Sequence, residues 1–239
     1  MISLEIPVEK IPYVRTIEGR KFKAGKWEFP DSALPKLQQY GLVSSDINVK
    51  EKEIVQYELS PHLRKYQSDI VNKALNEECY GIFADTGTGK TIIGLEIAKH
   101  YGKALILCPL SVIETAWIDD CKSFYPELKI VNCWGNTKKD RLKALNSESN
   151  IYVSFKILKK QIFNMDFQCV IIDESQVMKN MTAQITNELL ELIDIIPHRF
   201  VLSGTPTPNH NSEIFPQMKF VDTEIFGNNF YGFQAKYFH

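Results

Sequence analysis

The chain has 239 residues, 44% of them hydrophobic, and its 28 Lys and Arg nearly balance 29 Asp and Glu, for a formal net charge of −1. This length suits one large domain with or without a small appendage, the composition can bury a sizeable core, and the near-neutral charge neither supports nor excludes a nucleic-acid partner. The sequence has no apolar stretch of roughly 18 to 20 residues, which excludes a membrane-spanning class, and its scattered cysteines argue against a disulfide framework or a zinc site.

The first 55 residues have a pattern of their own, and we expect them to form a small α+β accessory module. Residues 11–30 alternate apolar and charged side chains around a turn at Gly25, which predicts a hairpin. Residues 31–32, Asp-Ser, are placed to cap a short helix. A further strand is expected at residues 47–59.

Residues 56–239 alternate strands with helices, which predicts a parallel sheet with helices on both faces. Apolar strands are expected at residues 80–84, 103–109, 128–134, 150–155, 169–174 and 199–204. Helical runs separate them, at residues 90–101, 111–125, 137–146 and 185–196. Trp117 lies among the apolar positions of one such run, and we expect it in the core. The fold class is therefore α/β.

A glycine-rich loop, DTGTGKT, joins the first of these strands to its helix. Such a loop wraps phosphates with backbone N–H groups, and the positive N-terminus of the helix favours the anion. Lys90 would reach the β- and γ-phosphates, and Thr91 would offer its hydroxyl to Mg²⁺. The usual pattern begins with glycine, where this chain has Ala84. We expect a nucleotide to bind at Asp85, Thr86, Gly87, Thr88, Gly89, Lys90 and Thr91.

Two adjacent carboxylates, Asp173 and Glu174, follow the apolar strand CVII. Asp173 would hold Mg²⁺ through waters that the ion retains. Glu174 would orient and deprotonate the attacking water. With Lys90, these carboxylates form the expected catalytic set of a nucleotide hydrolase.

Five segments resemble, in their order, the motifs of superfamily-two helicases, and more narrowly those of Swi/Snf-type DNA translocases. They are HLRKYQ, ADTGTGKT, LILCPLSVIETAW, VIIDESQVMKN and LSGTPTPN. The resemblance covers residues 60 to about 226. It implies a RecA-like ATP-binding lobe at residues 56–239, hydrolysis of ATP with Mg²⁺, and movement along duplex DNA through sequence-independent backbone contacts.

The same resemblance assigns roles to further residues. Arg64 and Gln67 belong to the segment that recognises adenine, for which a side-chain amide can both donate and accept hydrogen bonds. The residues expected to couple hydrolysis to movement are Gln176, Ser203, Gly204 and Thr205. Contacts with the nucleic-acid backbone are expected at predicted strand ends, at Pro109, Leu110, Ser111, Ser154 and Phe155.

The chain departs from the family pattern in the segment VIIDESQVMKN. Gln176 stands where this branch usually has His, and Ser175 stands where Ala is more usual. An amide can still hydrogen-bond across to the third motif. More loosely, Arg20, Trp27 and Pro30 resemble the HARP-type element that precedes the motor in annealing helicases, and a hairpin that caps a sheet edge is the alternative.

A working motor of this family has two RecA-like lobes, and the second supplies an arginine finger worth on the order of 10³–10⁵ in rate. We expect this chain to be the first lobe of a longer protein, a monomer that hydrolyses ATP poorly alone. Two other interpretations stay open: an RNA helicase or restriction-type translocase lobe, and a DNA-annealing or DNA-binding module with a weak ATPase. The start of the sequence lacks the apolar core of a signal peptide, and no histone-reading module is visible that would imply chromatin remodelling. Since compactness leaves a bacterial or viral source open, we expect a cytoplasmic protein of bacterial or viral-host origin, with the nucleus left open.

Overall fold

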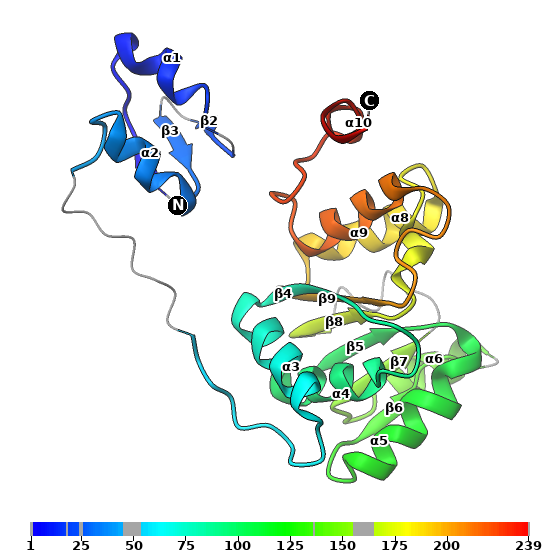
Figure 1. Ribbon diagram of the computed structural model, residues 1–239. Coiled ribbons are helices and arrows are strands. Elements are labelled where there is room, and N and C mark those ends of the chain that lie inside the picture. Colours follow the sequence, from blue (N-terminus) through cyan, green and yellow to red (C-terminus); the bar gives the residue numbers. More distant parts are fainter. Residues whose placement is uncertain are drawn as a thin grey trace. The chain divides into compact units, whose positions relative to one another are not determined.

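The computed structural model describes residues 2–17, 19–23, 26–44, 54–135, 137–154 and 165–238. The chain forms two compact units, Met1–Ile54 and Val55–His239 (Figure 1). Among the described residues, no helix has both the length and the apolar character needed to cross a membrane. Phe155 and the expected hairpin turn at Gly25 lie outside the described residues.

The first unit is a small antiparallel sheet with short helices. Its elements are β1 Ile2–Leu4, a 3-10 turn Val8–Lys10, α1 Ile11–Val14, β2 Lys21–Lys23, β3 Lys26–Phe29, a 3-10 turn Asp31–Ala33 and α2 Leu34–Gln39. β3 pairs with both β1 and β2, and its Phe29 is buried with Val14, Ile17 and Leu37. The expected hairpin is formed by β2 and β3, and the expected helix is α2. Strand β1 and helix α1 were not expected from the sequence.

The second unit contains a sheet of parallel strands in the order β4-β9-β8-β5-β7-β6. The strands are β4 Cys79–Phe83, β5 Ala104–Leu107, β6 Ile130–Asn132, β7 Ile151–Ser154, β8 Cys169–Ile172 and β9 His198–Ser203. The helices are α3 Lys65–Glu77, α4 Lys90–Tyr101, α5 Asp119–Phe124, α6 Lys138–Leu145, α8 Gln184–Leu190, α9 Ile214–Val221 and α10 Phe230–Tyr237. Tighter 3-10 turns are Leu110–Val112, Ser175–Met178, Glu191–Asp194 and Asn211–Glu213, and Ile113–Ile118 is a π-helical turn.

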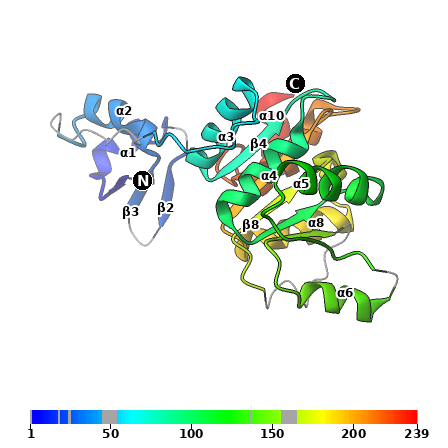
Figure 2. The ribbon, with the colours of Figure 1, turned by 90° about the horizontal axis from the view of Figure 1, so that it is seen from below.

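Alternating side chains of the strands form two cores, one on each face of the sheet. Ala104 and Ile106 of β5 pack with α3, α4 and α5, whereas Leu105 and Leu107 pack with α8 and α9. The pleat of a strand explains this division, because successive side chains point to opposite faces. Figures 1 and 2 show these helices along the two faces of the sheet. The expected α/β fold with helices on both faces is confirmed.

The carboxyl ends of the strands meet at one edge of the sheet. Phe83 of β4 pairs with Ser203 of β9, and Leu107 of β5 pairs with both Ile172 of β8 and Ser154 of β7. The loops that follow these strands therefore open side by side. Ligands of parallel α/β sheets bind at this edge, outside the carboxyl ends of the strands.

The strand expected at residues 47–59 is not formed in its described part. Instead, side chains of α3 hydrogen-bond the backbone there. The N–H of Val55 donates to Oδ1 of Asn76, and the N–H of Tyr57 donates to Oδ1 of Asn72, both at 2.9 Å. These amides satisfy the backbone groups that a sheet ladder would otherwise use, so the prediction of a strand is wrong at this place.

The segment expected as one helix at residues 111–125 has three parts. It passes from the 3-10 turn Leu110–Val112 through the π-helical turn Ile113–Ile118 into α5. A π-helical turn is wider than an α-helix and is often found at functional sites. The change of geometry alters the direction of the side chains that face the sheet.

Helices α9 and α10 were not expected from the sequence, and aromatic side chains join them. The ring of Phe233 in α10 lies 5.0 Å from that of Phe215 in α9 and 4.7 Å from that of Phe226, measured between centroids. Tilted aromatic pairs at such distances add packing energy beyond the apolar area that they bury. This cluster holds α10 against α9.

Candidate functional site

The loop between β4 and α4 takes a backbone that its glycines permit. Gly87 and Gly89 have φ angles of 79° and 77°, in the left-handed region that side chains disfavour. A Cβ on Gly89 would also lie 2.5 Å from Nε2 of Gln67, so a side chain there would displace the Gln67 amide. Ala84, in contrast, continues β4, and its N–H donates to the Ser203 carbonyl at 3.1 Å. The position where the usual pattern has glycine thus directly follows the strand and keeps a hydrogen bond to β9.

Lys90 begins α4, and its side chain turns back over the loop. Nζ donates to the carbonyl oxygens of Ala84 at 2.8 Å and Asp85 at 3.1 Å. A Cβ on Gly204 would lie 3.5 Å from this Nζ and 3.5 Å from Cγ2 of Thr86. The loop after β9 therefore lies directly against the phosphate loop.

The start of α3 supports the phosphate loop. Nε2 of the buried Gln67 donates to the Thr88 carbonyl at 3.1 Å, and Oε1 accepts from the N–H of Arg64 at 2.9 Å. The Tyr66 hydroxyl donates to the same Thr88 carbonyl at 2.8 Å. Both ends of the Gln67 amide are thus engaged within the protein, and adenine recognition by Gln67 and Arg64 stays a prediction.

Asp173 and Glu174 follow β8 at the carboxyl edge of the sheet. The Asp173 carboxylate accepts from Nε1 of Trp117 at 3.0 Å and from the N–H of Glu174 at 3.0 Å. Burial raises the pKa of the Asp173 carboxyl, and the hydrogen bond from Trp117 partly opposes that rise. Glu174 has φ 51° and ψ 53°, a strained conformation for a residue with a side chain. Both acidic residues are thus held by specific local contacts.

A chain of hydrogen bonds joins Glu174 to the loop after β9. Nε2 of Gln176 donates to Oε2 of Glu174 at 2.6 Å, and the Ser203 hydroxyl donates to Oε1 of Gln176 at 2.7 Å. The N–H of Thr205 in turn donates to Oγ of Ser203 at 3.0 Å. The amide of Gln176 therefore bridges the two loops. The same edge of the sheet holds the remaining expected nucleotide residues, Thr86, Gly87, Thr88 and Thr91.

A second hydrogen-bonded link passes through α9. The Ser175 hydroxyl donates to Oε1 of Gln217 at 2.7 Å. Nε2 of Gln217 donates to the carbonyls of Pro206 at 2.6 Å and Glu213 at 3.0 Å. Gln217 is fully buried, so these partners satisfy an amide that has no access to water. Ser175 and the loop after β9 are thereby tied to the same side chain.

The residues expected to contact nucleic acid differ in exposure. Leu110 is 51% exposed and Ser111 is exposed, in the 3-10 turn that follows β5 and Pro109. Ser154 is only 3% exposed at the end of β7, and Phe155 lies outside the described residues. The structure therefore presents the turn after β5 to solvent and places Ser154 in the interior.

A cavity of about 460 Å³ lies at the carboxyl ends of β5 and β8. Its lining includes Pro109, Asp173 and Glu174. Ile185 and Leu189 of α8 supply an apolar wall. Pro109, which precedes the exposed turn, thus shares this space with the two carboxylates.

Residues 43–238 match the family described as "SNF2-related domain". The chain belongs to this family. It is 31% identical over 210 residues to the Caenorhabditis elegans homolog of "SWI/SNF-related matrix-associated actin-dependent regulator of chromatin subfamily A-like protein 1", covering 81% of this chain and 28% of the relative. It is 26% identical over 193 residues to the Candida albicans "Chromatin-remodeling ATPase INO80", covering 70% of this chain and 14% of the relative. This SNF2-related chain thus spans well under a third of either relative.

Among solved structures, the SNF2-related chain resembles the Sulfolobus solfataricus SWI2/SNF2 ATPase core in complex with dsDNA. The TM-score is 0.66 at 22% sequence identity, over 77% of this chain and 41% of that one. At this identity the likeness concerns the fold, and it confirms the RecA-like lobe that the motifs imply.

The expectation of a cytoplasmic protein of bacterial or viral-host origin is wrong. Relatives of this SNF2-related chain are eukaryotic proteins named for chromatin, which points to the nucleus. The expectation rested on the compactness of the chain, and chromatin remodelling was not implied because the sequence shows no histone-reading module. A motor lobe folds without such a module, so its absence says nothing about the compartment in which the motor works.

Sequence reasoning missed three side chains in this SNF2-related site: Tyr66, Trp117 and Gln217. Trp117 is buried, as expected, but its N–H reaches Asp173. A signal existed, since the N–H of a buried tryptophan usually finds a partner. Gln217 offered another signal, because it is a lone amide in the mainly apolar run IFPQMKFV, and a buried amide requires hydrogen-bond partners.

Proposed function

We propose that this chain is the first motor lobe of an ATP-dependent DNA translocase, which binds ATP with Mg²⁺ and contacts the backbone of duplex DNA. One observation carries the proposal. Lys90, Glu174 and the loop at Ser203 meet at one edge of the sheet, linked by hydrogen bonds and close contacts, beside the exposed turn at Ser111. The named activities of the chromatin relatives and the DNA-bound Sulfolobus core support it.

The phosphate loop fits a triphosphate. The N-cap of α4 is Gly89, which has no side chain to cap the first N–H groups of the helix, so they are available to an anion. Nζ of Lys90, which contacts two loop carbonyls, would exchange these for phosphate oxygens. Asp173 and Thr91 offer the oxygen ligands that Mg²⁺ prefers, and the ion would neutralise charge on the phosphates.

Within this arrangement, Glu174 orients and deprotonates the attacking water. The hydrogen bond from Gln176 fixes one carboxylate oxygen of Glu174. Because Gln176 also accepts a hydrogen bond from Ser203, a movement of Glu174 is transmitted to Ser203. A second RecA-like lobe supplies the cation that stabilises charge on the transferred phosphoryl group. Alone, the chain therefore binds ATP weakly and hydrolyses it slowly.

The nucleic-acid partner is duplex DNA, held without regard to sequence. The exposed hydroxyl of Ser111 and the backbone N–H groups beside Leu110 are suited to phosphate oxygens. Pro109 orders the start of this turn, whereas Ser154 at the end of β7 is only 3% exposed and is not part of the proposed interface. We further propose that residues 1–55 act as an accessory module to the lobe at residues 56–239, and that the protein is a monomer.

Replacement of the loop lysine tests the proposal. Lys90→Ala should weaken binding of a fluorescent ATP analogue by at least about tenfold, because the cation facing the phosphates is lost. Lys122→Ala, on the exposed side of α5, is the matched control and should bind as the parent chain does. Equal binding by Lys90→Ala and the parent would contradict the nucleotide site.

The identity of the nucleic-acid partner is tested by adding duplex DNA, single-stranded DNA or RNA to the same chain. The measurements are the rate of ATP turnover and the affinity for each nucleic acid. Duplex DNA should bind most tightly and give the largest stimulation. A preference for RNA would favour the RNA-helicase alternative, and binding without any turnover, even with a second lobe supplied, would favour the annealing module. Rapid turnover by this chain alone would contradict the need for a second lobe.

A further inference from the structure

We propose that Trp117 is a positioning residue, which fixes the metal-binding carboxylate of Asp173 and links it to the nucleic-acid contact at the turn after β5. The inference rests on the proposed function of this site. It gives a role to Trp117, the last residue of the segment LILCPLSVIETAW, and a route by which DNA binding can influence the catalytic acids.

The carboxylate of Asp173 is fixed at both of its oxygens. Nε1 of Trp117 donates to Oδ2 at 3.0 Å, and the N–H of Glu174 donates to Oδ1 at 3.0 Å. The backbone of Asp173 is held as well, since its N–H donates to the Leu107 carbonyl at 2.8 Å. Trp117 is the one of these donors that comes from a side chain, so it can change position without unfolding the sheet.

The indole of Trp117 occupies a slot beside α4. A Cβ on Gly94 would lie 2.7 Å from Cη2 of Trp117 and 3.3 Å from Cδ1 of Leu202. Gly94 therefore leaves room for the ring, although glycine is less favourable than alanine inside a helix. The ring contacts α4, which follows the phosphate loop, and lies near β9, which precedes the loop at Ser203. A shift of the indole would therefore change its packing against both elements.

The backbone that carries Trp117 is the π-helical turn Ile113–Ile118. This turn follows the 3-10 turn Leu110–Val112 without a break, and that turn presents Leu110 and Ser111 to solvent. One short segment therefore has the expected DNA contact at its beginning and the donor to Asp173 at its end. Because π-helical geometry is rare and less favourable than α-helical geometry, binding of DNA at the exposed turn can change the conformation of the segment that carries Trp117.

Packing alone does not account for the hydrogen bond. A phenylalanine would fill much of the same slot, whereas only the indole N–H reaches the acid. Partners that hydrogen-bond a metal ligand orient it, and their loss typically lowers metal affinity about 10- to 100-fold. If DNA moves Trp117, its binding changes the affinity of the site for the Mg²⁺–nucleotide complex. Thermodynamic linkage then requires that the Mg²⁺–nucleotide complex changes the affinity for DNA by the same factor.

The test measures the Mg²⁺ concentration that half-saturates binding of a fluorescent ATP analogue to the full chain, with and without duplex DNA. Trp117→Phe should raise this concentration about tenfold and abolish most of the change that DNA causes. Trp27→Phe, in the first unit, removes a tryptophan elsewhere and should match the parent. A Trp117→Phe chain with a lower Tm but the parent's Mg²⁺ dependence would make Trp117 a packing residue and overturn the proposal.

A second measurement keeps Trp117 in place. In ¹⁵N NMR spectra, the indole N–H signal of Trp117 should shift and exchange faster with solvent in Asp173→Asn, and duplex DNA added to the parent should shift the same signal. If the Trp117 signal is unchanged both in Asp173→Asn and on addition of duplex DNA, the proposal is overturned. If the parent chain shows no Mg²⁺-dependent nucleotide binding at all while Asp173→Asn still moves the signal, the proposed function fails and the structural link stands.

Discussion

Around the ends of β4, β8 and β9, the candidate side chains are hydrogen-bonded to one another, whereas the turn after β5 presents Leu110 and Ser111 to solvent. The first group has its donors and acceptors oriented before any ligand arrives, which is the arrangement that stabilises developing charge most effectively. The second group has hydroxyl and backbone groups that can adapt to a repeating phosphate backbone. The difference suggests one region built for a fixed geometry and another built to bind and release.

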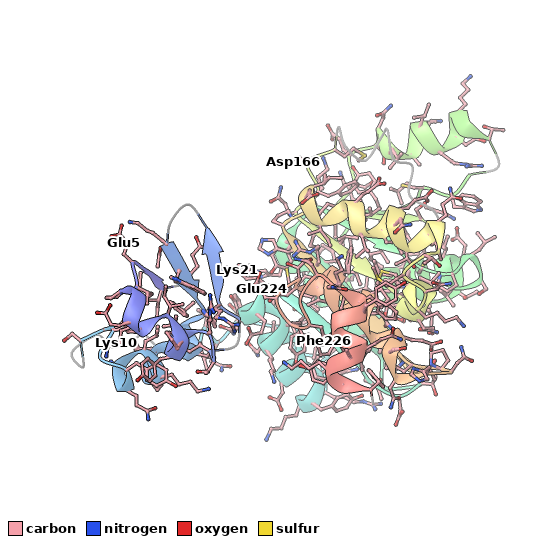
Figure 3. The ribbon with its side chains drawn as sticks, turned by 90° about the horizontal axis from the view of Figure 1, so that it is seen from above. Glu5, Lys10, Lys21, Asp166, Glu224 and Phe226 are labelled. Carbon is pink, nitrogen blue, oxygen red and sulfur yellow. The ribbon has the colours of Figure 1, made fainter. Side chains whose placement is uncertain are left out.

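The largest effect is expected from Asp173→Asn, which changes the hydrogen-bonded region at the ends of β4, β8 and β9. The amide keeps the size of the side chain but removes the charge that binds Mg²⁺, so DNA-stimulated ATP turnover should fall on the order of 10²-fold. Asp166→Asn, at an exposed carboxylate labelled in Figure 3, is the matched control. Turnover is followed by phosphate release in the presence of a second lobe. Retained turnover in Asp173→Asn would mean that another group binds the ion.

Gln176→Ala should have the next largest effect, because it cuts the link between Glu174 and Ser203. Stimulation by DNA should fall about tenfold while ATP-analogue binding is kept, since a hydrogen bond to a carboxylate is lost away from the phosphate loop. A neutral histidine can also donate to one side and accept from the other, so Gln176→His should restore most of the stimulation. If Gln176→Ala behaves like Gln168→Ala, its control, the bridge has no part in coupling.

Gln217→Leu tests the second link through stability. It leaves the Ser175 hydroxyl and the carbonyls of Pro206 and Glu213 without their buried partner, which should lower the free energy of unfolding by about 1–3 kcal/mol. Urea denaturation gives this value. Adding Ser175→Ala to Gln217→Leu should recover part of the loss, because one unsatisfied group is then removed. No recovery would assign the loss to packing alone.

The smallest effect is expected from Ser111→Ala in the exposed turn. One neutral hydrogen bond to a phosphate is lost, so affinity for duplex DNA should fall about two- to fivefold, equally for different sequences. ATP-analogue binding should not change. Ser123→Ala in α5, whose hydroxyl donates to the Asp119 carbonyl, is the control. A larger loss of ATP binding than of DNA binding would contradict the division between the two regions.

The sheet and the phosphate loop could be predicted because their causes are local. Continuous apolar runs mark buried parallel strands, and Gly87 and Gly89 mark a backbone that other residues disfavour. The acids at Asp173 and Glu174 follow from their place at the end of such a run. These features require only neighbouring residues, and the sequence displays those directly.

The missed features depend on partners that are distant in the sequence. Trp117 reaches an acid 56 positions away, and Gln217 reaches a serine 42 positions away. A buried indole N–H and a lone amide in an apolar run indicate that a hydrogen-bond partner exists, but they do not identify that partner. The strand expected before α3 failed for a related reason, since the side chains of Asn72 and Asn76 take over its backbone groups.

The backbone at Glu174 has a consequence for how this chain tolerates change. A residue with a side chain in the left-handed region costs on the order of 1–2 kcal/mol, a cost that glycine avoids. Glu174→Gly would therefore relieve strain in the fold while it removed the base that we propose activates water. Stability and catalysis make opposite demands on this single position. A screen that selects only for folding stability is therefore expected to favour glycine at position 174, in a protein that has lost the proposed ATP hydrolysis.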